Sequence, residues 1–172
     1  MGTIVEEDFT SNLFTLLKET FEGPPPKTAS AFLDQGCGLF QTVEGLTAED
    51  ASRPARPGGT TVAAHCAHMK FYLDVLHRYM QGPIEPADWK QSWLVQTVSA
   101  EEWEALRREL REGYATISEA LRSVESWGER PVGVGMAVVA HTAYHLGAVR
   151  QLVRSLGRDH EHQEGARHAP AP

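Results

Sequence analysis

Apolar residues recur every three or four positions in several stretches of the chain, which is the spacing of amphipathic α-helices. Segments rich in proline and glycine separate these stretches, and both residue types end helices. The pattern predicts helices over about 8–22, 28–43, 60–80, 99–126 and 136–157. Signals for β-strands are weak throughout. The sequence therefore predicts an all-α protein.

Local signals define some of these helices better than others. Ser99 and Glu102 form the signature of a capping box at the start of the fourth helix. Gly157 is suited to end the last helix, because glycine adopts the left-handed conformation at low cost. The second helix is weaker, since Gly36 and Gly38 each cost about 1 kcal/mol relative to alanine. Close packing of another helix against these glycines is one explanation, and flexibility is the other.

The long helices favour a four-helix bundle of antiparallel type, with 8–22 as an extra short N-terminal helix. The chain has 172 residues, which fits one domain, and we expect this domain to cover 1–157. Residues 158–172 lack apolar periodicity and are predicted to form a disordered tail. The irregular connection 82–98 is long enough to carry function or to cover a pocket.

Charge and cysteine content exclude several classes of function. The 23 acidic and 16 basic residues give a net charge of −7, which argues against a nucleic-acid-binding surface. Cys37 and Cys66 are too few for a disulfide framework, so a reducing compartment is expected. The chain shows neither the features of a signal peptide nor the ~18 uninterrupted apolar residues of a membrane span. We therefore expect a soluble cytoplasmic protein with no membrane and no nucleic-acid partner.

Two histidines lie on the apolar stripe of the last predicted helix, in the segment AHTAYHLGAVRQL (140–152). His141 and His145 are four positions apart, so on a helix their Cβ atoms lie about 5–6 Å apart, close enough to share a metal ion. Buried imidazoles must be hydrogen-bonded or metal-bound to offset the loss of solvation. The pair therefore indicates either a metal site or hydrogen-bonded core histidines.

A third ligand is available on the predicted helix 60–80, where His65 and His68 share a face. Helices that face each other in a bundle bring their side chains to one point. Three imidazoles with one position left for water form an open, catalytic type of site for Zn²⁺ or Ni²⁺. Such an ion lowers the pKa of its water toward ~7 or binds a thiolate. Cys66 lies beside these histidines and could add a ligand.

Periodicity places His65 and His68 at different depths. The apolar stripe of their helix centres nearer to His65, which predicts that His65 is buried more deeply. A ligand of an open site can lie at the edge of such a stripe, so the residues alone leave both histidines as candidates. No general base is evident beside them, and Glu85 and Asp88 would serve only if their connection folds over the pocket.

The segments TVAAHCAHMKFYL (61–73) and HTAYHLGAVRQL (141–152) resemble the metal-binding motifs of DinB/YfiT-like proteins. The resemblance implies a four-helix bundle that holds a divalent metal, Zn²⁺ or Ni²⁺, with three histidines. Of the two candidates in the first segment, the motif aligns the histidine that is followed by Met or Leu. The metal ligands that it implies are His68, His141 and His145.

The same resemblance, which covers roughly residues 28–157, implies a homodimer and a small-molecule substrate. Characterised relatives use small thiols such as mycothiol or bacillithiol for S-transfer, or hydrolyse their substrates with the metal. Our first hypothesis is an enzyme whose metal activates a small thiol for attack on an electrophile. A hydrolase that uses metal-bound water is the nearest alternative, and a non-catalytic bundle that binds a metal or ligand is the other. His65 is then expected to form a hydrogen bond close to the metal.

Overall fold

The computed structural model describes residues 5–27 and 29–157, and the predicted all-α class is confirmed. Within these ranges the structure contains helices and no β-strand. The helices are α1 (Glu6–Glu22), α2 (Leu39–Val43), α3 (Ala48–Ser52), α4 (Val62–Gln81), η1 (Gln91–Trp93), α5 (Ala100–Arg122) and α6 (Glu129–Ser155). The predicted tail 158–172 lies outside the described residues.

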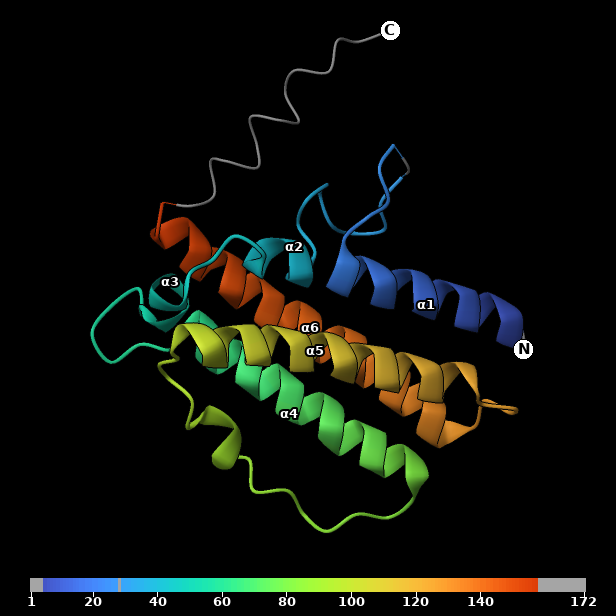
Figure 1. Cartoon of the computed structure of the whole chain (residues 1–172). Coiled ribbons are helices and arrows are strands. Elements are labelled where there is room, and N and C mark those ends of the chain that lie inside the picture. The colour runs from blue at the N-terminus through green and yellow to red at the C-terminus, as the bar shows by residue number, and fades with distance from the viewer. Residues whose placement is uncertain (1–4, 28, 158–172) are drawn as a thin grey trace, which may run out of the picture.

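Four of these helices are long and form a bundle: α1, α4, α5 and α6. α4 packs against α5 and α6, and α1 packs against α6 (Figure 1). The N-terminal helix is therefore one of the four bundle helices and not an addition to them. The predicted helix 28–43 is wrong, because among its described residues, 29–43, only the last part, α2, is helical.

A buried carboxylate explains why the segment before α2 is not a helix. Glu19 of α1 is 3% exposed, and it accepts hydrogen bonds from the backbone N–H groups of Ala31, Phe32 and Leu33 at 2.7, 2.7 and 2.6 Å. These N–H groups bind a side chain of another element instead of carbonyls within a helix. Gly36 then takes the left-handed conformation, with φ 76°, that glycine adopts most readily. Tertiary hydrogen bonding thus overrides the helical spacing of this segment.

The last helix begins seven residues earlier than the sequence predicts, at Glu129 instead of 136. Pro131 lies in the first turn, where a helix does not need the N–H that proline lacks. Gly135 lies inside the helix, where an added Cβ would come within 2.5 Å of a methyl carbon of Leu13 in α1. Glycine at 135 therefore leaves room for the Leu13 side chain where α1 packs against α6.

The capping signals are confirmed. The carboxylate of Glu102 accepts the backbone N–H of Ser99 at 2.7 Å, and the Ser99 hydroxyl accepts the N–H of Glu102 at 3.2 Å. Gly157 follows the last helix with φ 75°. The buried indole of Trp103, one turn into α5, donates to the carbonyl of Leu46 at 2.8 Å. Local caps and this anchor hold α5 in place.

α6 is the most apolar helix of the bundle core. It is long and apolar enough to cross a membrane, with a mean hydropathy of 1.4 over its most apolar window. It also packs against α4, α1 and α2, and it carries buried polar residues, Thr142 and His145. Core helices of bundles share this length and composition, so α6 alone is weak evidence for a membrane span.

We predict that Glu19→Gln lowers the free energy of unfolding at pH 7 by about 1–3 kcal/mol, because an amide cannot accept all three backbone N–H groups. Urea denaturation measures the difference, with the exposed Glu7→Gln in the same helix as control. Burial raises the pKa of Glu19, but the three hydrogen bonds prevail and lower it below its ordinary 4.5. The stabilisation should thus be complete above pH 4.5 and decline as the pH falls further. Equal stability of both variants at pH 7 would contradict this role.

Candidate metal centre

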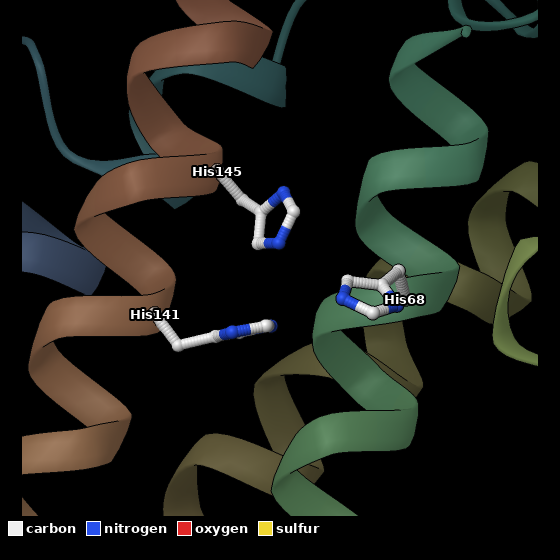
Figure 2. Close-up of side chains that lie close together, drawn as sticks. All are labelled: His68, His141 and His145. Atoms are coloured by element: carbon white, nitrogen blue, oxygen red, sulfur yellow. The ribbon is translucent and has the colours of Figure 1, made fainter. Parts of the chain in front are cut away.

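Three of the predicted site residues meet at the interface between α4 and α6. One ring nitrogen from each of His68, His141 and His145 lies within 4.8 Å of the others. Figure 2 shows His141 and His145 on successive turns of α6, facing His68 on α4. The i, i+4 spacing puts the first two on one face, and the packing of α4 against α6 brings His68 to them. Among the described residues, only these three form a group of potential metal ligands.

Ser92 determines which nitrogen of His68 faces the cluster. Its hydroxyl donates to the carbonyl of Trp89 at 2.7 Å, and its oxygen lies 2.7 Å from Nδ1 of His68. Since the hydroxyl hydrogen is already used, the oxygen accepts the Nδ1–H of His68. Nε2 of His68 therefore keeps its lone pair. Trp93 stacks on the same imidazole, with ring centroids 4.1 Å apart.

His65, which lies on α4, forms a hydrogen bond to a histidine of the cluster. Its Nδ1 lies 3.0 Å from Nδ1 of His145, and its Nε2 lies 3.1 Å from the hydroxyl of Thr60. This agrees with the expectation that His65 is a buried neighbour of the site. Because Nδ1 of His145 is engaged, its Nε2 is the nitrogen available to a metal ion.

His141 has a buried nitrogen without a partner. Its side chain is half-buried, yet Nε2 has no hydrogen bond among the described residues. Tyr72 stacks on the ring, with centroids 3.6 Å apart and planes at 11°. A buried polar atom without a partner is unfavourable, and a metal ion would satisfy it. The three imidazoles thus fit a divalent metal that prefers nitrogen ligands.

Burial keeps these histidines neutral. It lowers the pKa of His145 to about 3, with further contributions from the charged forms of His141, His68 and His65. Burial, and then His68, lower the pKa of His141 to about 4. Burial also lowers the pKa of His65 and of His68. Only a neutral imidazole offers a lone pair, so at neutral pH these histidines are in the form that a metal ion would require.

The remaining sequence candidates lie outside the cluster. Cys66 points into the hydrophobic core, and burial raises the pKa of its thiol to about 12, which disfavours a ligand role. Asp88 is exposed and accepts hydrogen bonds from Lys90 and Gln91 within its own turn. Glu85 is also exposed. No carboxylate of the described residues belongs to the histidine cluster.

The sequence did not indicate the parts played by Ser92, Trp93 and Tyr72. Ser92 and Trp93 lie in η1, inside the irregular connection 82–98. Its length was the one available signal, because it predicted a segment that covers a pocket. Tyr72 lies one turn after His68, and this spacing is the only sequence signal for its place beside the cluster.

Comparison with protein-family models matches residues 38–149 to the family described as the DinB superfamily. The match includes α4, α5 and most of α6, and therefore all three histidines of the cluster. α1 precedes it. Comparisons with curated proteins and with solved structures gave no match.

We predict that metal-free protein loses stability as the pH falls from 6.5 toward 5. The folded protein keeps His141 and His145 neutral, whereas the unfolded chain binds protons below their ordinary pKa of 6.5. Stability from these groups is therefore complete above pH 6.5 and declines below it. Urea denaturation after chelation, repeated at several pH values, measures how steeply the free energy of unfolding falls with pH. The double variant His141→Gln/His145→Gln should show a shallower fall. The same pH dependence in the wild type and the double variant would contradict the prediction.

Proposed function

The chain belongs to the DinB superfamily, and from this membership and the histidine cluster we propose that it is a metal-dependent enzyme that activates a small thiol for S-transfer to an electrophile. The observation that carries the proposal is the group of three neutral imidazoles, one of which has a buried Nε2 without a partner. We propose Zn²⁺ or Ni²⁺ as the metal, because both accept nitrogen ligands.

In this proposal His68, His141 and His145 are the metal ligands. These three residues would hold the ion and leave a coordination position free for the thiol, and the ion would supply a Lewis acid that favours the thiolate over the thiol. Ser92 and His65 orient His68 and His145 through their Nδ1 atoms. The rings of Trp93 and Tyr72 cover two of the imidazoles and limit the access of water to them.

The surroundings of the cluster favour a thiol over a water nucleophile. No carboxylate among the described residues belongs to the cluster, so the protein offers no evident acidic side chain to take a proton from water. A thiol has a pKa of about 8.5 and needs less assistance than water to lose its proton. The chain has only two cysteines, Cys37 and Cys66, as expected for a protein of a reducing cytoplasm where small thiols are available. Hydrolysis by metal-bound water is the second enzymatic candidate.

The ligand assignment predicts different results for the two histidines of α4. His68→Ala should lose stoichiometric metal, as should His141→Ala and His145→Ala. His65→Ala should weaken metal binding by about 10–100-fold, because it removes only a hydrogen bond to a ligand. Elemental analysis of untagged protein and titration with a competing chelator measure these effects, with circular dichroism to check that the helices remain. Loss of metal in His65→Ala with retention in His68→Ala would overturn the assignment.

The thiol proposal predicts a spectral change when a small thiol meets the Co²⁺-substituted protein. 2-Mercaptoethanol should alter the d–d bands and add a sulfur-to-metal charge-transfer band. Ethanol, which lacks the sulfur, is the matched control. Metal that remains bound with no response to thiol would contradict S-transfer and favour hydrolysis or a purely binding role.

We further propose that the protein is a homodimer, and the exposed face of α6 supports it. No Asp, Glu, Lys or Arg occurs from 131 to 149. On that stretch Met136 is 57% and Tyr144 is 75% exposed. A helix face that exposes large side chains and carries no charge is usually covered by another surface. Sedimentation equilibrium should give twice the chain mass for the wild type and a smaller mass for Met136→Glu, while a monomeric wild type would contradict the proposal.

A further inference from the structure

A cavity of about 450 Å³ lies between α4 and α6, beyond the histidine cluster. Its lining residues are Leu76, Tyr79, Glu129, Arg130, Gly133, Val134 and Ala137. Leu76 is one helical turn after Tyr72, whose ring stacks on His141. Ala137 is one turn before His141 on α6. The cavity and the cluster therefore follow one another along the same interface, with Tyr72 between them.

Gly133 lines this cavity without a side chain. A Cβ added at this position would have no atom within 4 Å, so packing does not require glycine there. Glycine inside a helix is less favourable than alanine, and α6 carries it without a compensating contact. This differs from Gly135, where a Cβ would meet Leu13. Helix packing therefore does not account for the glycine at 133, and its position leaves room in the cavity wall that a large side chain would occupy.

The cavity is apolar inside and charged at its exposed end. Leu76, Val134 and Ala137 contribute aliphatic side chains. Arg130 is exposed, and its guanidinium lies 5.0 Å from the centre of the Tyr79 ring. Neither Arg130 nor Glu129 forms an ion pair within the described part of the chain. This arrangement suits a chain that lies against the aliphatic residues and ends in an anionic group beside Arg130.

We propose that this cavity is the subsite for the non-reacting end of the substrate, an apolar chain that ends in a carboxylate held by Arg130. The inference rests on the proposed function, because it takes the reacting thiol to lie at the histidines. Arg130 and His141 are eleven residues apart, which is roughly 16 Å along a helix. The substrate is therefore elongated, with its thiol and its carboxylate at opposite ends.

A series of ω-mercapto acids tests this length and polarity on the Co²⁺ protein. The probes are 3-mercaptopropionate, 6-mercaptohexanoate and 11-mercaptoundecanoate, each with the ω-mercapto alcohol of equal length as its uncharged partner. Affinity, read from the charge-transfer band, should rise by up to about fourfold for each methylene that enters the cavity. The longest acid should bind about two- to fivefold more tightly than its alcohol, as expected for an exposed ion pair.

Variants of the lining residues separate the parts of the proposal. Gly133→Leu should abolish the gain with chain length, whereas Gly133→Ala, which leaves most of the space, should retain it. Arg130→Gln should remove the preference for the acid, and Glu129→Gln should increase it. Arg78→Gln, an exposed arginine outside the lining, is the charge control and should change nothing.

The outcomes distinguish failure of the subsite from failure of the proposed function. The subsite would be overturned, and thiol activation left intact, if all thiols bind with an affinity that does not depend on chain length, on the charge of the probe or on the Gly133→Leu substitution. If no thiol changes the Co²⁺ spectrum, the subsite is tested alone by calorimetry with decanoate, which has no sulfur. Decanoate should bind the wild type and Gly133→Ala but not Gly133→Leu, and absence of binding to the wild type would overturn the subsite.

Discussion

The imidazoles withdrawn from solvent between α4 and α6 fix the alignment of these two helices. His65 contacts His145, and Tyr72 stacks on His141, so each pair joins one turn of α4 to one turn of α6. A slide by one turn, about 5.4 Å, would break both contacts and leave ring nitrogens without partners. An interface of aliphatic residues alone tolerates such a shift far better. The polar cluster therefore specifies the register on which the site and the neighbouring cavity depend.

The connection between α4 and α5 completes the cluster from a third side. Ser92 fixes the tautomer of His68, and Trp93 covers its ring. A hydrogen bond fixes the C-terminal end of this connection: the Thr61 hydroxyl donates to the carbonyl of Gln96 at 2.8 Å. Irregular backbone is thus positioned by the same helix that carries His65 and His68. This gives a loop residue a defined place beside a rigid pair of helices.

The electrostatic character of the site follows from burial. The imidazoles lose their charge because solvent is excluded and because each would repel the charged form of the others. Neutral imidazoles are what a divalent metal requires, so exclusion of water keeps these histidines in the form that the proposed metal would bind. The proposed chain of contacts from the metal ligands through Tyr72 to the cavity near Arg130 then assigns separate places to the reacting and non-reacting ends of a substrate.

Sequence alone determined the features that depend on neighbours within one or two turns. The spacing of His141 and His145 places them on one face of a helix, and the Ser99–Glu102 cap starts α5, because both follow from helix geometry. The tertiary structure decided what depends on distant residues. Glu19 draws the backbone of 31–33 out of a helix, and Ser92 reaches His68 from another element. The resemblance of 61–73 to a family motif had implied His68, whereas the periodicity of the helix left His65 as a second candidate; the packing of α4 against α6 brings His68 into the cluster and leaves His65 beside it. Helix periodicity alone contains none of these contacts, because they form only when the helices pack and buried polar groups compete for the same partners.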